Sequence, residues 1–157
     1  MRLAKHVDTL DEQLKNNESQ LDEVVRASEA SELLNETGLK AITAAKCLVA
    51  WSHAGRDRSE AAFAALAGTN QIPAPSVNTT RHRLNRGGDR NLNSSLHMVA
   101  VTRITHDPKT GEFVEKRRAE RKTDREIRRC LKRYLARRIF KILSAASTRN
   151  IDASAVA

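Results

Sequence analysis

The sequence has few aromatic residues, few cysteines and no long apolar segment, and each shortage excludes a class of protein. Aromatic residues make up 3% of the 157 residues, which leaves little for stacking of single-stranded bases. Cys47 and Cys130 form no Cys-x-x-Cys pair or Cys/His cluster, so both are expected to be small buried hydrophobic residues and not zinc ligands. Without a secretory leader, apolar span or lipidation signal, the protein is expected to be cytoplasmic.

Charge is unevenly distributed along the chain. The net charge is +9, but residues 1–38 hold four Lys and Arg against nine Asp and Glu. Residues 81–149 hold twenty against seven. A strongly basic body is typical of proteins that bind a polyanion. Nucleic acid is therefore the leading candidate partner, and a membrane surface is the weaker alternative.

The densest basic segment is TTRHRLNRGGDR at residues 79–90. Its arginines are Arg81, Arg83, Arg86 and Arg90. Cationic side chains this close cannot be buried together without partners, so they face water or an anion. The Gly87–Gly88 pair lets the backbone turn sharply or approach a ligand closely. A solvated loop is the simpler interpretation, whereas the surrounding basic half favours phosphate binding.

Residues 3–25 predict a helix with a narrow apolar stripe. The apolar positions alternate four and three residues apart, at Leu3, Val7, Leu10, Leu14, Leu21 and Val24. Asn17 fills the missing position of this heptad pattern, where a polar residue can fix register and strand number. Residues 1–35 are therefore predicted to be a coiled-coil dimerisation helix. The alternative is an amphipathic helix that packs on its own domain, because the segment holds few heptads.

Two short helices are expected next. Residues 37–52 predict one helix. Ser59 is the expected N-cap of a second helix, and Gly68 is its C-terminal stop. Trp51 and Phe63 are the expected core residues of these helices.

The second half of the chain predicts a loop, a helix and a turn. Residues 69–91 lack periodicity and contain two prolines, so they are expected to be a loop. Residues 91–104 have apolar positions on one helical face, and HDPKTG at residues 106–111 predicts a turn. No segment predicts a strand.

A long basic helix is expected over residues 112–143, interrupted near Lys122. Thr123 and Glu126 match a capping box that would open its second part. Its apolar side is expected to be Ile127, Leu131, Tyr134, Leu135 and Ile139. Residues 144–157 are expected to be a flexible tail. The predicted fold class is therefore all-α: a coiled-coil helix, a small helical domain with a basic loop, and a long basic C-terminal helix.

Several sequence segments follow one another in a fixed order over residues 36–143. They are the helix around Ala44–Ala45, SEAAFAALAG, IPAPS, TTRHRLNRGG and RCLKRYLAR. This order resembles the C-terminal half of the IS110 family of insertion-sequence transposases, with its IS116 and IS1111 relatives. Such proteins have a RuvC-like nuclease domain with four acidic residues, a coiled coil and a helical transposase domain. The resemblance implies that residues 1–35 are the coiled coil and residues 36–143 the transposase domain.

The resemblance also implies a catalytic serine, Ser76, eight residues after Gly68. Its hydroxyl would attack a DNA phosphodiester and form a phosphoserine link, which conserves the bond energy for rejoining. Nearby cations would position the strand or stabilise the charge of the phosphorane. The expected nucleic-acid-binding residues are Arg81, Arg83, Arg86, Arg90, Arg129, Lys132 and Arg133. From the residues alone, Ser76 would be a turn serine after a proline.

The sequence departs from the family pattern in two places. Family members often carry Ser-Ser-Gly where Pro75–Val77 stands, and Gly-x-Gly-Pro where Gly38–Ala41 stands. The acidic quartet that would hold Mg²⁺ is expected in a nuclease domain missing from this chain, because Asp57, Glu60 and Asp89 are isolated. No cofactor is therefore expected here, and the chain is expected to be a truncated transposase that does not recombine DNA alone.

The histidines and the tyrosine add no other chemistry. His82, His97 and His106 lack a metal-binding spacing, so no metal site is expected. A set of Arg83, His97 and Tyr134 lacks the spacing of a tyrosine recombinase, and core packing is the expected role of Tyr134.

Three interpretations remain open. The first is the serine-bearing part of a transposase that acts with a nuclease half, DNA and a structured non-coding RNA, and that oligomerises through the coiled coil. The second is a non-catalytic dimeric nucleic-acid-binding module. The third is a decayed transposase remnant. For the isolated chain, contact with the nucleic-acid backbone is favoured over catalysis.

Overall fold

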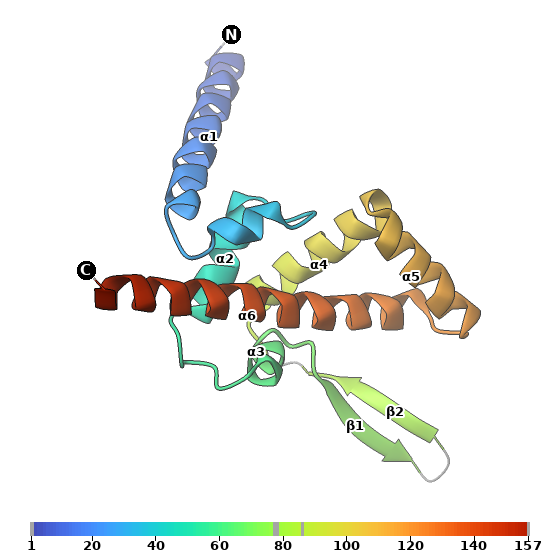
Figure 1. The fold of residues 1–157 in the computed structure, drawn as a ribbon. Helices are drawn as coiled ribbons and strands as arrows, with labels where there is room; N and C mark the ends of the chain where they lie inside the picture. Colours follow the sequence, from blue (N-terminus) through green and yellow to red (C-terminus); the bar gives the residue numbers. More distant parts are fainter. Residues whose placement is uncertain (1, 77–78, 86, 157) are drawn as a thin grey trace.

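The computed structural model describes the chain path of residues 2–76, 79–85 and 87–156, and the side chains of residues 3–70, 85 and 87–150. The long helix α6 (Asp124–Val156) crosses the middle of the molecule (Figure 1). Four further helices pack against it: α2 (Ala41–Trp51), α3 (Glu60–Leu66), α4 (Arg90–His106) and α5 (Pro108–Ala119). The predicted all-α class is confirmed for this body.

The core lies between α6 and the helices that cover it. Trp51 and Phe63 are fully buried there, as predicted, and the Phe63 ring lies 6.0 Å from that of Phe140. The predicted apolar side of α6 is confirmed for its four aliphatic residues, Ile127, Leu131, Leu135 and Ile139. It is wrong for Tyr134, which is 54% exposed and meets Phe113 edge-on. Its ring lies at the margin of the α5–α6 contact and not inside the core.

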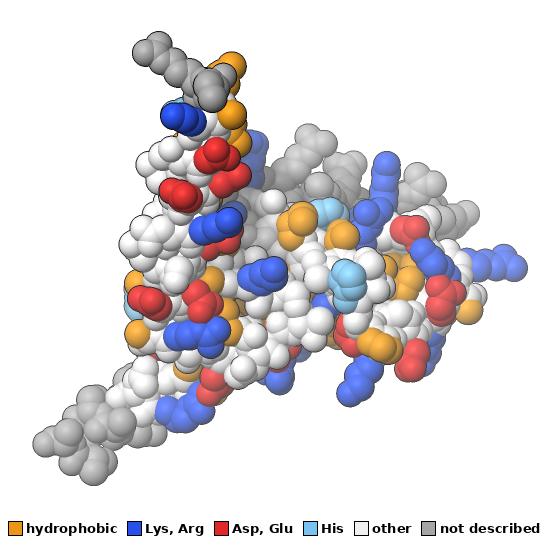
Figure 2. Space-filling model, turned by 90° about the horizontal axis from the view of Figure 1, so that it is seen from above, with side chains coloured by type: hydrophobic (Ala, Val, Ile, Leu, Met, Phe, Trp, Pro, Cys, Tyr) orange, Lys and Arg blue, Asp and Glu red, His pale blue; other side chains and the backbone are white. Residues whose placement is uncertain are grey.

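Helix α1 (Arg2–Arg26) projects from the body (Figure 1). It joins the body at its C-terminal end, where Val25 is buried and Leu21 packs on the core. Its predicted apolar stripe is exposed at Leu3, Val7, Leu10, Leu14 and Val24. Figure 2 shows hydrophobic side chains along one edge of this helix, beside charged ones. The alternative that the whole stripe packs on its own domain is therefore wrong, and pairing with another chain stays a prediction.

Residues 71–76 and 79–84 form the two strands of a β-hairpin, so the predicted loop is wrong for these residues. Strand β1 (Gln71–Ser76) pairs antiparallel with β2 (Thr79–Leu84), from Gln71 opposite Leu84 to Ser76 opposite Thr79. Both strands of a two-stranded ribbon are edge strands, which tolerate proline. Pro73 and Pro75 lie two residues apart, so both backbone nitrogens face the same edge of β1. The hairpin extends from the body below α6 (Figure 1).

The helix ends follow the predicted capping residues in most places. Ser59 accepts a hydrogen bond from the Ala62 backbone N–H, and Gly68 adopts a φ of +65°, so both predicted ends of α3 are confirmed. Helix α2 begins at Ala41, later than predicted, because Gly38 has a φ of +82° and keeps the chain out of helical geometry. The short 3₁₀ helix η1 (Ser31–Asn35) precedes it.

The predicted turn at HDPKTG is shorter than expected. Only Asp107 lies between α4 and α5, because Pro108 is well suited to the first position of a helix. The Asp107 carboxylate caps α5 by accepting hydrogen bonds from the Lys109 backbone and the Thr110 hydroxyl. The helix therefore resumes at once and includes Gly111.

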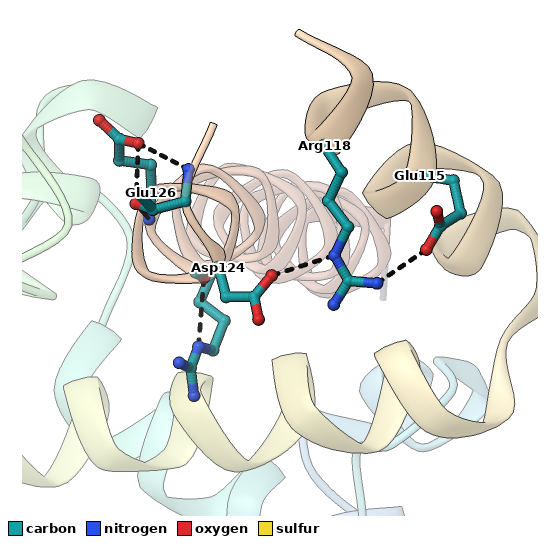
Figure 3. A network of polar contacts seen from close by, with 6 residues as sticks. Glu115, Arg118, Asp124 and Glu126 are labelled. Carbon is teal, nitrogen blue, oxygen red and sulfur yellow. Dashed lines mark hydrogen bonds and ion pairs between the residues drawn. The ribbon is translucent and has the colours of Figure 1, made fainter. Parts of the chain in front are cut away.

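The predicted interruption of the basic helix is confirmed between α5 and α6. The Thr123 backbone N–H donates to Glu126 at 2.8 Å, which makes the expected capping box. Arg118 of α5 bridges to α6 through Asp124 at 3.1 Å, and it also pairs with Glu115 within α5 at 2.8 Å (Figure 3). These polar contacts fix the corner at which the chain enters α6.

The expected flexible tail is instead a continuation of α6 to Val156. Ala146 and Ser147 are buried, and Arg149 forms an ion pair with Glu32. Within the described chain, no helix combines the length and apolarity needed to cross a bilayer.

Candidate nucleic-acid interface

The base of the hairpin is attached to the C-terminal end of α3. The last carbonyls of a helix lack intrahelical partners, and here other segments supply the donors. The pairs are Thr69 Oγ1 to Ala64 O (2.8 Å), Asn85 Nδ2 to Ala65 O (3.3 Å), Asp89 N to Leu66 O (2.7 Å) and Asn93 Nδ2 to Ala67 O (2.6 Å). Both ends of the hairpin and the first turn of α4 are thereby held on one helix terminus.

Two glycines allow the chain segments at the hairpin base to cross. A Cβ added at Gly88 would lie 2.4 Å from the Gly68 nitrogen and 2.5 Å from its Cα. No side chain fits in that space. The sequence suggested that the Gly87–Gly88 pair turns sharply or approaches a ligand; at Gly88 the close approach is to the protein's own backbone.

Lys132 lies inside this base although it was predicted to contact nucleic acid from the surface of α6. Its side chain is buried, and Nζ donates to Asn93 Oδ1 at 2.7 Å. The Asn93 amide in turn donates to Ala67 O. Burial, helped by the charge of Arg129, lowers the pKa of Lys132. The network links α3, α4 and α6 beneath the hairpin.

A row of basic side chains lies along α6, spaced four residues apart. Arg125, Arg129, Arg133, Arg137 and Lys141 recur at this spacing, which places them along one side of the helix. Arg137 and Lys141 both pair with Glu60. Among the ion pairs of the described side chains, none involves Arg129 or Arg133. The N-terminal half of the row therefore keeps its charge available to an anion.

The basic row of α6 borders a hollow of about 460 Å³ beside the hairpin base. Arg129 and Arg133 line it together with Lys122, Arg137 and one carboxylate, Glu126; its other lining residues are Thr69, Cys130 and Tyr134. Because Thr69 caps α3 at the start of the hairpin, this hollow reaches the hairpin base.

The structure places the predicted serine at the end of the hairpin farthest from the body. Ser76 is the last residue of β1, opposite Thr79. Arg83 lies opposite Ile72 and Arg81 opposite Ala74 on the return strand. The side chains of Ser76, Arg81 and Arg83, and Arg86 as a whole, lie outside the described parts, so their contacts stay predictions.

The remaining predicted residues lie at the hairpin base or along α6. Arg90 is exposed in the first turn of α4 and lines one hollow with Lys132. Arg129 and Arg133 line the other hollow. The structure thus brings Arg90 and Lys132 together at the hairpin base, whereas Ser76 lies at the far end of β1, about 17 Å of strand from Gln71.

The described residues do not fit a metal centre. They bring together no group of three His, Cys, Asp or Glu side chains able to hold an ion. No magnesium step is therefore assigned to these side chains. Cys47 is buried as predicted, and burial raises the pKa of its thiol to about 12. Cys130 is half-buried.

Sequence reasoning missed the residues that hold the hairpin base. Asp89 could have been found, because an acidic residue before an apolar helical pattern is a usual N-cap; it accepts from Leu92 N at 2.7 Å. Asn85, Asn93 and Thr69 carry no such signal, because their partners lie on a helix end that only tertiary packing brings near.

A comparison with known families identifies the family of this chain. A family model described as the transposase IS116/IS110/IS902 family matches residues 30–115, from before η1 into α5. The matched segment contains α3, the hairpin and its anchored base. No curated protein matches the chain at a significant level.

Proposed function

The chain belongs to the IS116/IS110/IS902 family of transposases, and on this premise we propose that it is the DNA-binding, serine-bearing part of an insertion-sequence transposase. One observation carries the proposal. A hairpin clamped at its base to α3 carries Ser76 at its far end, and a hollow beside that base is lined by Arg129 and Arg133 of α6, which form no ion pair among the described side chains. Such an arrangement would present a hydroxyl to a strand whose backbone the arginines bind.

The proposed reaction is attack by the Ser76 hydroxyl on a DNA phosphodiester. The bond between Oγ and phosphorus forms, and the bond from phosphorus to the leaving sugar oxygen breaks. The serine proton passes to water or a general base, and the leaving oxygen takes up a proton. Because one phosphoester replaces another, the bond energy is kept for rejoining. Arg81 and Arg83 on β2 are proposed to stabilise the charge of the five-coordinate phosphorus.

Partners complete the proposed activity. Residues 1–35 are proposed to pair with a second copy through the exposed stripe of α1, and residues 36–143 to act as the DNA-binding domain. Any magnesium-dependent step is assigned to a nuclease half, because the described side chains form no carboxylate cluster. A structured RNA is a further proposed partner that would choose the DNA site.

A non-catalytic nucleic-acid-binding module is the second candidate. Val77 stands beside Ser76 where family members often carry glycine, and a β-branched residue restricts the backbone there. In this case the anchored hairpin and the arginines would still bind DNA, without strand cleavage. The buried core and satisfied helix ends favour either candidate over a decayed remnant.

Binding of the purified chain to duplex DNA across a salt series tests the proposed function. We expect binding with a steep log–log slope, about −0.9 for each phosphate neutralised. Changing Arg129 and Arg133 together to Gln should reduce the slope by about 1.8. Changing Lys5 and Lys15 of α1 to Gln removes the same charge elsewhere and should leave the slope unchanged.

The same material separates the two candidates. Ser76→Ala should bind DNA like the wild type in both cases. With a nuclease half added, the wild type should form a covalent DNA adduct and Ser76→Ala should not. Absence of DNA binding even at low salt contradicts both candidates.

A further inference from the structure

We propose that a second hollow, at the hairpin base, is a phosphate site that holds one phosphodiester of the bound DNA strand. The hollow measures about 480 Å³ and is lined by three basic side chains, Arg90, His97 and Lys132. Its other polar side chains are the neutral Asn85, Asn93 and Ser94. No acidic residue is among the described lining residues. The proposal rests on the DNA-binding function proposed above and locates one contact within it.

Two helices build the lining. Arg90, Asn93, Ser94 and His97 follow the i, i+3, i+4, i+7 spacing that puts side chains on one face of α4. Lys132 approaches from α6. Gly68 and Gly88 form the wall on the hairpin side, where their backbones touch. The basic groups therefore converge from separate elements, held by the anchored hairpin base.

Lys132 is the strongest evidence for an anion. Its side chain is about nine-tenths buried, and its hydrogen-bond partner among the described groups is the neutral Asn93 amide oxygen. A buried cation without a counter-charge is unfavourable. The nearby charge of Arg129 adds to the excess of positive charge around Lys132. A phosphate oxygen would supply the missing negative charge. It would also accept a hydrogen bond from one of the two remaining ammonium N–H groups of Lys132.

The nearest carboxylate in the sequence does not neutralise this hollow. Asp89 directly precedes Arg90, but its side chain accepts a hydrogen bond from Leu92 N at 2.7 Å as the N-cap of α4. It is not part of the lining. The charge of Lys132 is thus left for an external anion.

The site would set the register of the DNA strand relative to Ser76. The hollow lies at the hairpin base and Ser76 at the far end of β1, which itself spans about 17 Å. Successive phosphates of one DNA strand advance by about 3.4 Å along the helix axis. A DNA strand that ran along the hairpin would therefore place a phosphate in the hollow about five or more nucleotides from the bond that Ser76 is proposed to attack.

Three probes test the site: inorganic phosphate, duplex DNA and a structured RNA. The variants are Lys132→Met, which keeps the apolar stem, and Lys46→Met, which removes the same charge from an exposed position on α2. We expect inorganic phosphate to raise the melting temperature of wild type and Lys46→Met above that in chloride at equal ionic strength. Lys132→Met should lose this shift. Its slope in a DNA salt series should fall by about 0.9, while Lys46→Met keeps the wild-type slope.

A second variant keeps the test decisive if Lys132→Met does not fold. Arg90 is exposed on the rim of the hollow, so Arg90→Gln should fold normally, weaken the phosphate shift and reduce the DNA slope by about 0.9. The proposal is overturned if Lys132→Met, or in its place Arg90→Gln, matches Lys46→Met in both measurements.

The outcomes also separate this site from the proposed function. A Lys132-dependent phosphate shift without duplex binding would keep the anion site and reject its assignment to DNA. Duplex binding with equal slopes for Lys132→Met and Lys46→Met would keep the DNA-binding function and reject the site. Dependence on Lys132 with a structured RNA alone would overturn the assignment to DNA.

Discussion

At the scale of single residues, small and neutral side chains hold the hairpin of the proposed interface in position. Asn93 donates to the end of α3 and accepts from Lys132, so one amide holds two helices in place. Gly88 has no side chain, and this absence lets two backbones cross. The arginines can bind a DNA strand next to Ser76 only if this base holds the hairpin in position.

The first residue-scale prediction concerns Gly88. Gly88→Ala should lower the free energy of unfolding by about 3 kcal/mol, because the new Cβ would overlap the Gly68 backbone. Chemical denaturation measures the change. Gly111→Ala is the matched control, since a Cβ there meets nothing within 4 Å and alanine favours the α5 helix by about 1 kcal/mol. Equal stability of the two variants would mean that the glycine crossing is not close-packed.

At the scale of elements, the molecule has two parts that extend from its body, α1 and the hairpin. The hairpin is bound to the body at both of its ends. Helix α1 is bound only at its C-terminal end, and its apolar stripe is exposed over most of its length. Isolated helices are only marginally stable in water, so a partner that covers the stripe would stabilise α1.

The element-scale prediction is that α1 pairs with a second copy. Leu14 is 59% exposed on the stripe, so Leu14→Glu should place charges on both sides of the seam and weaken dimerisation at least tenfold. Gln13→Glu adds the same charge outside the stripe and should leave the dimer intact. Sedimentation equilibrium measures both, with circular dichroism as a check of folding. A wild-type monomer at high concentration would refute the pairing.

At the scale of the whole molecule, the acidic N-terminal region neutralises part of the basic body. Glu36 bonds Arg103 of α4 at 2.8 Å and Arg138 of α6 at 2.9 Å. Glu32 pairs with Arg149. Outside the N-terminal region, Glu60 of α3 pairs with Arg137. These contacts tie segments distant in sequence to α4 and α6. Among the described side chains, Arg125, Arg129 and Arg133 in the first half of α6 form no ion pair and keep their charge for a polyanion.

The whole-molecule prediction uses the pH dependence of Glu36. Burial opposes its ionisation, but hydrogen bonds from Arg103 and Arg138 outweigh burial and lower the pKa of Glu36. Its stabilising contribution is therefore complete above its ordinary pKa, near 4.5, and is lost as the pH falls through the lower folded value. Glu36→Gln should cost about 1–2 kcal/mol at pH 7, and this cost should shrink toward pH 3.

Thermal melts from pH 3 to pH 7 measure this difference. Glu12→Gln, at an exposed position of α1, should match the wild type throughout. A cost of Glu36→Gln that stayed constant with pH would show that the two ion pairs do not stabilise the fold.

The sequence by itself determined most of the helices, several of their ends and the family. Helical periodicity, the Ser59 and Thr123 caps and the Gly68 stop are local signals, because each depends on residues within one or two turns. The order of motifs over residues 36–143 pointed to the same family as the matched model. These features need no knowledge of how the elements pack.

Only the tertiary structure decided the hairpin, its anchoring and the position of Lys132. The two prolines favoured a loop prediction over β1. The strand forms only with its partner, because its backbone hydrogen bonds need the second strand. Asn93 and Lys132 lie 39 residues apart, and no periodicity relates them. Lys132 was predicted to be a surface cation, but it is buried because α4 and α6 enclose it. Contacts between distant elements arise only on packing, so the proposed phosphate site could not be predicted from the sequence.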